Sequence, residues 1–301
     1  MTQRSITNKF GISLWTNDQG QGAPVLLISG ANASALMWPD EFADLIVQKG
    51  FRVIRYDHRD TGKSDRIDFE ANPYSVADLC EDAVAVLDEL NIQKAHVVGL
   101  SLGGTIGQVL ALDHPERLLS LTLMMTAALD VDFSRNWMLA MEGKTVKDDL
   151  PIPRPEVVSS FQAPLKDPEA EIRRRVEQWK LLSAPGAAFD EADYIAREKA
   201  DIQHSGVVPA PFAHALAAPV PLERGGELKH VGVPTLVIQA MEDPLNPPPH
   251  GQHLADLIPT AKLVGIEGLG HALPKPVFAK LASLLVSHWN GAEKAQVASG
   301  I

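Results

Sequence analysis

The chain has 301 residues, of which 45% are hydrophobic and 22% charged, a composition typical of a globular protein and not of a disordered or fibrous one. The net charge of −11 argues against a nucleic acid or an anionic membrane as a partner, because both bind clustered Lys and Arg. A single cysteine, Cys80, excludes a disulfide framework and a cysteine-rich metal site. Neither a signal-peptide core nor an apolar run of about 20 residues is present, so we expect a cytoplasmic protein with no membrane partner.

Short apolar runs alternate with amphipathic stretches in the first part of the chain and again after residue 231. The pattern predicts strands at 12–15, 25–29, 52–56, 95–99, 119–125 and 235–240, and helices at 42–49, 76–90 and 103–112. Strands that alternate with helices imply parallel pairing. The expected fold class is therefore α/β, with a mostly parallel central sheet flanked by helices.

Residues 129–230 break this alternation. The segment is rich in proline, and its regular parts, at 169–182 and 191–200, have helical character. We interpret it as a helical cap inserted between late strands, which leaves residues 1–128 and 231–301 as the core. The tail from about Asn290 is small and polar and is expected to fray.

Residues 99–103 read Gly-Leu-Ser-Leu-Gly and lie between a predicted strand and a predicted helix. A serine on such a sharp turn is held in a strained conformation, and its oxygen projects over the sheet beside a helix N-terminus that favours negative charge. Ser101 is therefore the candidate nucleophile. The N–H of Leu102 is one candidate donor to an oxyanion, and the N–H of Ala31, in the turn after an early strand and beside Asn32, is the other.

A serine hydroxyl needs a base, which a carboxylate orients. With a nucleophile on a strand-to-helix turn, the expected order along the chain is serine, acid, histidine. Asp243 follows the strand at 235–240, and His271 lies between small residues in Gly-His-Ala. Glu242 and Asp130 remain alternative acids. Four further histidines are assigned to the surface or to the satisfied core: His96, His204, His214 and His250.

Residues 57–64 end like a phosphate-binding loop, with Gly-Lys-Ser after a strand. Asp57 stands where that loop needs its first glycine, and Asp60 adds a second carboxylate inside it. Two negative charges are wrong for a phosphate site. We therefore expect no nucleotide, and the Ser-His-Asp chemistry requires neither a metal nor an organic cofactor.

These motifs resemble the α/β-hydrolase family over nearly the whole chain. Residues 57–64 are similar to the family pattern Asp-x-Arg-Gly-x-Gly-x-Ser, except that Asp60 replaces a glycine, and residues 29–31 read Ser-Gly-Ala where His-Gly-x is common. Longer stretches resemble the aclacinomycin methylesterase-like serine esterases: 34–36, 38–42, 55–62, 96–101, 234–240 and 270–274. The resemblance implies a nucleophile, an acid, a base and two oxyanion donors at Ser101, Asp243, His271, Ala31 and Leu102.

The same resemblance implies a serine esterase that forms an acyl-enzyme on a small-molecule ester, with a methyl ester of a polycyclic or other bulky apolar compound as the expected substrate. Lactonases, carbon–carbon bond hydrolases and cofactor-free perhydrolases use the same triad and remain alternatives. Oligomeric state stays undecided between monomer and homo-oligomer. The substrate is expected to contact Asn32 and apolar side chains of the cap, namely Trp137, Met138, Phe161 and Phe212.

Overall fold

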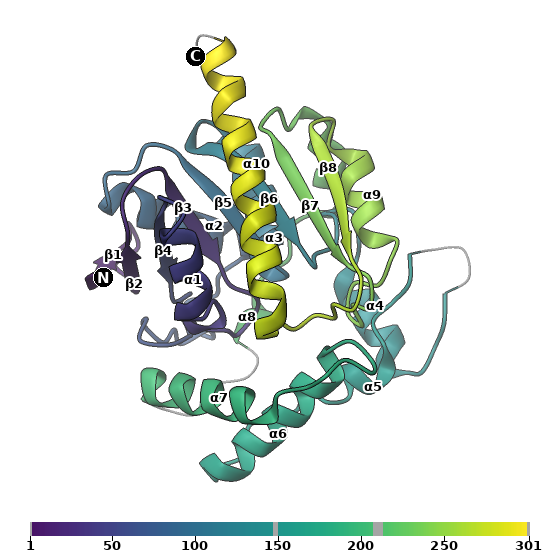
Figure 1. Cartoon of the computed structure of the whole chain (residues 1–301). Coiled ribbons are helices and arrows are strands. Elements are labelled where there is room, and N and C mark those ends of the chain that lie inside the picture. The colour runs from purple at the N-terminus through teal and green to yellow at the C-terminus, as the bar shows by residue number, and fades with distance from the viewer. Residues whose placement is uncertain (1, 147–149, 207–212, 300–301) are drawn as a thin grey trace.

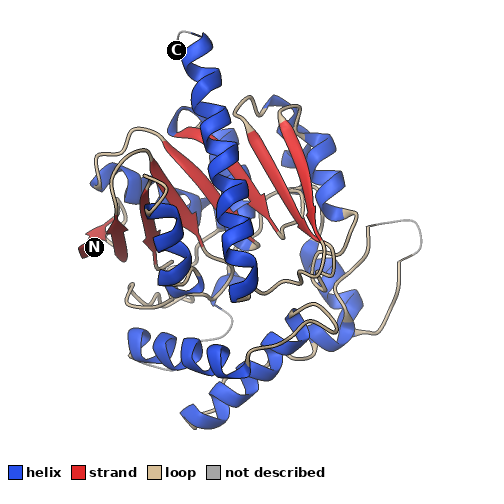
Figure 2. Cartoon of the chain, in the orientation of Figure 1, coloured by secondary structure: helices blue, strands red, loops and turns tan. Residues whose placement is uncertain are grey.

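An eight-stranded sheet forms the centre of the computed structural model, which describes residues 2–146, 150–206 and 213–299 (Figures 1 and 2). The strand order is β1-β2-β4-β3-β5-β6-β7-β8. β2 is antiparallel to both β1 and β4, and every other neighbouring pair is parallel. The expected fold class is confirmed. The strands are β1 (Thr2–Thr7), β2 (Ser13–Gln19), β3 (Pro24–Ile28), β4 (Arg52–Tyr56), β5 (Ala95–Leu100), β6 (Leu118–Met124), β7 (Thr235–Ala240) and β8 (Ala261–Ile266).

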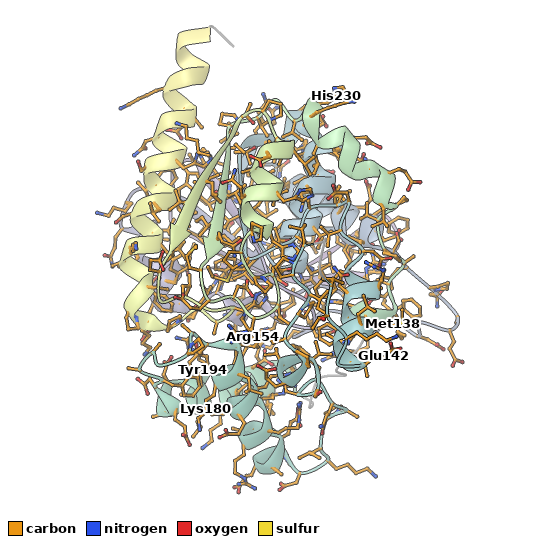
Figure 3. The ribbon with its side chains drawn as sticks, turned by 90° about the vertical axis from the view of Figure 1, so that its right-hand side faces the viewer. Met138, Glu142, Arg154, Lys180, Tyr194 and His230 are labelled. Carbon is orange, nitrogen blue, oxygen red and sulfur yellow. The ribbon has the colours of Figure 1, made fainter. Side chains whose placement is uncertain are left out.

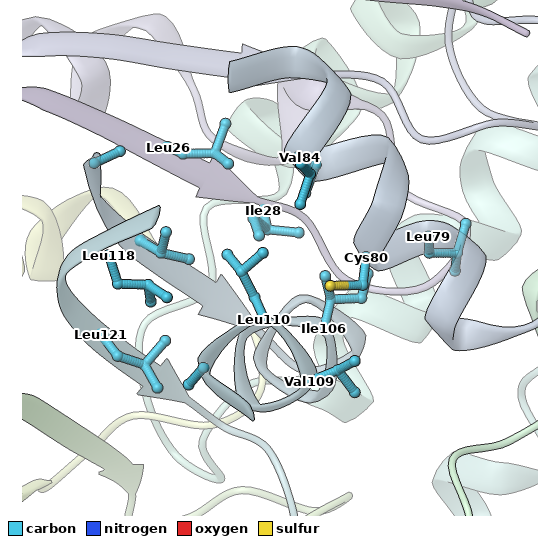
Figure 4. Close-up of a cluster of buried hydrophobic side chains, with 14 of the residues drawn as sticks. Leu26, Ile28, Leu79, Cys80, Val84, Ile106, Val109, Leu110, Leu118 and Leu121 are labelled. Carbon is cyan, nitrogen blue, oxygen red and sulfur yellow. The ribbon is translucent and has the colours of Figure 1, made fainter. Parts of the chain in front are cut away.

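Helices cover both faces of the sheet, because alternate side chains of each buried strand point to opposite faces. In β3, Val25 and Leu27 pack in the cluster that includes α1 and α10, whereas Leu26 and Ile28 pack against α2 and α3. Figure 4 shows part of this second cluster, with Leu26 and Ile28 facing side chains of the two helices. The flanking helices are α1 (Asp40–Val47), α2 (Val76–Glu89), α3 (Leu102–Asp113), α9 (His250–Leu257) and α10 (Phe278–Ser299).

The strand order reverses between β3 and β5. From β3 the chain adds β4 on one side, and from β5 it adds β6, β7 and β8 on the other. Open α/β sheets bind ligands at such a switch point, outside the carboxyl ends of the strands. The register brings the ends of β3, β5 and β6 together, since Ile28 pairs with Gly99 and Leu100 with Met124.

The chain between β6 and β7 is helical, which confirms a helical cap inserted between late strands. Figure 1 shows α5, α6 and α7 below the edge at which the parallel strands end. A third apolar cluster joins Val157, Ile172, Val176 and Tyr194 of this layer to Leu245 and Ala272 of the core. The limits of the cap at 129 and 230 stay a prediction. The segments are α4 (Phe133–Met141), α5 (Pro155–Val158), α6 (Pro168–Leu182), α7 (Glu191–Ser205), α8 (Ala213–Leu216) and η3 (Leu222–His230).

Neither edge strand was predicted from the sequence: β1 is mostly polar, and the short apolar stretch of β8 is interrupted by Lys262 and Gly265. Five of the six residues of β1 are exposed, and β8 buries only Ile266. The expectation that the tail frays from Asn290 is wrong. The helix α10 continues to Ser299, because Ala, Glu, Lys and Gln in this tail are good helix formers. In the described ranges, no helix combines the length and the apolar character that a membrane span requires.

Candidate active site

Ser101 lies on a strained turn between β5 and α3. Its backbone has φ 54° and ψ −117°, a left-handed φ that side chains other than glycine rarely adopt. The Ser101 N–H donates to the carbonyl of Met124 (2.9 Å), and the Ser101 carbonyl accepts from the Gly104 and Thr105 N–H groups (2.8 and 3.1 Å). A Cβ at Gly103 would lie 2.3 Å from the Ile28 carbonyl oxygen, so glycine is required for α3 to approach β3.

Asp243 and His271 form a buried pair beside this turn, 1% and 5% exposed. His271 Nδ1 lies 3.0 and 2.9 Å from the two carboxylate oxygens of Asp243. Because a carboxylate only accepts, Nδ1 carries the proton and the lone pair of the neutral ring is on Nε2. Among the described residues the Ser101 hydroxyl has no hydrogen-bond partner, so the structure joins the acid to the histidine but not yet the histidine to the serine.

The alternative acids lie elsewhere. The carboxylate of Asp130 accepts from His253 Nε2 (2.9 and 3.0 Å), in a half-exposed contact. Glu242 donates its N–H to the Leu269 carbonyl (3.0 Å), and its Oε2 is buried without a hydrogen-bond partner in the part of the chain that is described. Of the three carboxylates, the one in contact with His271 is that of Asp243.

The acid turn is itself tied to the nucleophile strand by Asn246. Asp243 Oδ1 accepts from the Leu245 and Asn246 N–H groups (2.8 and 3.0 Å). The Asn246 side chain donates from Nδ2 to the carbonyl of Met125 (3.0 Å). Met125 follows Met124, whose carbonyl accepts from the Ser101 N–H. This network links the ends of β5, β6 and β7, and Asn246 was not singled out in the sequence.

The turn after β3 faces Ser101. A Cβ at Gly30 would lie 3.5 Å from the Ser101 Cβ, and the Gly30 N–H donates to Met37 Sδ (3.2 Å). Within the described chain, the N–H groups of Ala31 and Leu102 donate no hydrogen bond. N–H groups without partners at the ends of neighbouring strands, one of them the first of a helix, are the type of donor that an oxyanion hole uses.

The cap contacts both sides of this site. The His271 N–H donates to the carbonyl of Leu182 at the end of α6 (2.6 Å), and a Cβ at Gly270 would lie 2.4 Å from the same oxygen. On the other side, Ser34 Oγ donates to Asp201 Oδ1 of α7 (2.5 Å). The loops that carry the candidate base and the candidate oxyanion donor are thus both held by cap helices.

The expected substrate-contacting residues have different surroundings. Trp137 and Phe161 are half-buried, contact each other edge to face at 5.1 Å between ring centroids, and pack against the apolar cluster of the cap. Met138 is 59% exposed, and Figure 3 shows it on the outer side of α4 beside Glu142. Asn32 is hydrogen-bonded through its N–H and its side chain to His214. Phe212 lies outside the described residues.

A family model described as the alpha/beta hydrolase fold matches residues 23–274. The chain belongs to the α/β-hydrolase family. Rhodomycin D methylesterase DnrP of Streptomyces peucetius is 46% identical over 297 residues, which cover 97% of this chain and 99% of that protein. DauP of Streptomyces sp. (strain C5), also a rhodomycin D methylesterase, has the same identity and coverage. The meta-cleavage product hydrolase CumD of Pseudomonas fluorescens IP01 has a TM-score of 0.72 at 24% identity, over 96% of this chain and 98% of that chain. The expected family and the expected likeness to methylesterases are confirmed.

In this α/β hydrolase the loop at 57–64 turns a carboxylate inward. Asp57, which is fully buried, accepts hydrogen bonds from the N–H groups of Ala35 (2.7 Å) and Lys63 (2.8 Å). His204 Nε2 of the cap lies 2.7 Å from Asp57 Oδ2. The carboxylate thus occupies the centre of the loop, where a phosphate would need positive charge.

Asp60, which replaces the family's glycine, has φ 69° and is 5% exposed. Its Oδ2 accepts from the Tyr74 hydroxyl (2.7 Å), and its Oδ1 accepts from the Ile67 N–H (2.7 Å). The left-handed backbone explains why glycine suits this position. The two hydrogen bonds give the aspartate of this α/β hydrolase a structural use that glycine cannot supply.

Sequence reasoning assigned His204 and His214 to the surface or the satisfied core, and His214 is indeed buried with both ring nitrogens hydrogen-bonded. It did not predict their partners across the cap interface, Asp57 for His204 and Asn32 for His214. His214 is separated from Asn32 by 182 positions, and no local pattern marks such a pair. Asn246 carried a weak signal, because an aspartate commonly accepts from N–H groups two and three positions later.

Proposed function

We propose that this chain is a serine hydrolase that removes the methyl group from a carboxylic methyl ester of a bulky, apolar, polycyclic compound. The observation that carries the proposal is the 46% identity to two rhodomycin D methylesterases over nearly the full length of each chain. The alignment covers 97% of this chain and so includes nearly all of the cap segment, where the substrates of lid-bearing enzymes are selected. The carboxylic ester hydrolase class rests on the same relatives and on the family.

The proposed reaction uses the buried pair beside the nucleophile turn. Ser101 Oγ attacks the ester carbonyl while His271 Nε2 takes its proton, and the N–H groups of Ala31 and Leu102 stabilise the oxyanion. The carbon–oxygen bond to methanol breaks as His271 returns the proton to the leaving oxygen, which leaves an acyl-enzyme. Water then attacks, His271 accepts its proton, and Ser101 departs with a proton as the free acid forms.

Two geometric features support these roles. Asp243 accepts from Nδ1 of His271, which keeps the basic lone pair on Nε2, the nitrogen that must face the serine. Serine–histidine hydrogen bonds are often long before substrate binds and shorten in the complex. The absence of such a bond at Ser101 among the described residues is therefore consistent with its proposed role as nucleophile. The acid and its turn are already held by the Leu245 and Asn246 N–H groups, so the carboxylate is preorganised.

The test compares p-nitrophenyl esters of short, medium and long acids with rhodomycin D, the compound for which both relatives are named. Ser101→Ala, checked by circular dichroism, is the control. We expect methanol and the free acid from rhodomycin D, a preference for it over the simple esters, and loss of turnover in the variant. Hydrolysis that persists in a folded Ser101→Ala protein would refute the nucleophile. A ring-opened hydroxy acid or a cleaved diketone as the preferred product would refute ester cleavage.

A further inference from the structure

Two side chains of the cap hold the turn after β3, residues 29–34: Asp201 accepts from Ser34 at its end, and His214 contacts Asn32 in its middle. The Asn32 N–H donates to His214 Nδ1 (2.9 Å), and the His214 N–H donates to Asn32 Oδ1 (3.3 Å). His214 is 6% exposed and stands on α8, the short helix that follows α7. Its position is secured just downstream, because Ala218 exchanges backbone hydrogen bonds with Tyr74 and Val76 of the core (3.0 Å each).

The tautomer of His214 is determined by its partners. Nε2 lies 2.9 Å from the Arg59 carbonyl oxygen, which only accepts, so Nε2 carries the hydrogen. Nδ1 therefore presents its lone pair to the Asn32 N–H. Burial lowers the pKa of His214, which keeps the ring neutral and this acceptor available. A second buried ring, His58, contacts His214 edge to face at 5.3 Å and lies 3.0 Å from the Ser29 carbonyl through Nε2.

This contact controls the peptide next to the candidate oxyanion donor. The Ala33 N–H donates to the Gly30 carbonyl (3.4 Å), which makes Ala31 and Asn32 the central residues of a tight turn. Asn32 has φ 58°, so the turn requires a left-handed residue at its third position. A left-handed third residue defines a type II turn, and the orientation of the central peptide, here Ala31–Asn32, distinguishes it from the commoner type I turn. The hydrogen bond from the Asn32 N–H to His214 holds that peptide in the type II orientation.

We propose that His214 is a positioning residue of the oxyanion hole: the cap, through His214 Nδ1, locks Asn32 and thereby aims the Ala31 N–H at the oxyanion. The inference rests on the proposed function, since it assigns a task to a donor of that reaction. It makes the oxyanion hole depend on the cap being docked. Ser29, His58 and Ser34 secure the two ends of the turn, whereas His214 secures its middle.

Two substitutions separate the acceptor from the bulk of the ring. His214→Asn places an amide oxygen near the position of Nδ1, whereas His214→Leu fills similar space without an acceptor. Removal of an oxyanion donor costs about 10²–10³ in kcat, and a donor that is misdirected and not removed should cost less, about 10- to 100-fold. We expect that loss in His214→Leu with little change in KM for p-nitrophenyl acetate, and a substantial recovery in His214→Asn.

The affinity of a boronic acid that forms a tetrahedral adduct with the serine is a second measurement, and a purely structural role of His214 would not change it. This affinity should fall in His214→Leu by the same factor as kcat, because both report on the oxyanion hole. His204→Leu is the matched control, since it removes the other cap histidine that contacts the core without touching Asn32.

Three outcomes would overturn the inference: unchanged kcat in folded His214→Leu, equal losses in the Leu and Asn variants, or an equal loss of kcat and boronate affinity in His204→Leu. Ser101→Ala, assayed in parallel, keeps the two hypotheses apart. If it retains hydrolysis, the proposed function fails. If it abolishes hydrolysis while His214→Leu keeps its kcat, only the inference about His214 fails.

Discussion

Restoring the family's glycine at position 60 should destabilise this protein, although the backbone there has φ 69°. Asp60→Gly removes two hydrogen bonds to a buried carboxylate, from the Tyr74 hydroxyl and the Ile67 N–H, each at 2.7 Å. Hydrogen bonds to a charged group contribute about 1.5–3 kcal/mol each. Glycine would relieve about 1 kcal/mol of left-handed strain and lose about 0.4–1 kcal/mol through the greater freedom of the unfolded chain. The net loss in unfolding free energy is therefore about 2.5–6 kcal/mol.

Urea unfolding followed by tryptophan fluorescence measures this loss. With an m-value of about 3 kcal/mol/M, the midpoint of Asp60→Gly should fall by about 1–2 M. Tyr74→Phe completes a double-mutant cycle: it should be costly in the wild-type protein and much less so beside Asp60→Gly, because its partner is then already gone. A glycine variant as stable as the wild-type protein, or additive losses in the cycle, would refute the reasoning and show that backbone strain outweighs the two hydrogen bonds.

Further predictions concern the acid and the response to pH. Asp243→Asn should lower kcat about 10⁴-fold because the Nδ1–H tautomer is no longer fixed, whereas Glu242→Gln should leave kcat nearly unchanged; comparable losses in an ester assay of the two variants would show that the acid is misassigned. Burial lowers the pKa of His58 and of His96 to about 3, far below the value of about 6.5 in an unfolded chain. The unfolded state therefore binds protons that the folded state does not, and the stability present above pH 6.5 is lost as the pH falls toward 3, by up to about 1.4 kcal/mol per unit for each histidine. Urea midpoints at pH 7.5, 6.0 and 5.0 should show this slope, and His96→Gln should reduce it; an identical slope in that variant would contradict the assignment.

The elements that the sequence predicted well are those with a local cause. The strands of the sheet interior are continuous apolar runs because helices cover both faces, and the helices between them show one apolar stripe. Ser101 could be placed on its turn because the flanking strand, the helix and the two glycines are all adjacent in sequence. The same reasoning did not predict β1, which is mostly polar, or β8, whose short apolar stretch is interrupted by Lys262 and Gly265.

The fold class and the candidate chemical groups could be predicted from the sequence, because motif spacing and hydrophobic periodicity act over a few residues, and the resemblance of the motifs indicated the family. Three contacts became visible only in the folded chain: the acid that contacts His271, the partner of Asp60, and the reach of His214 to Asn32 across 182 positions. These contacts depend on strand order and on how the cap docks onto the sheet. The local sequence around these residues encodes neither feature, because each results from packing summed over the whole chain.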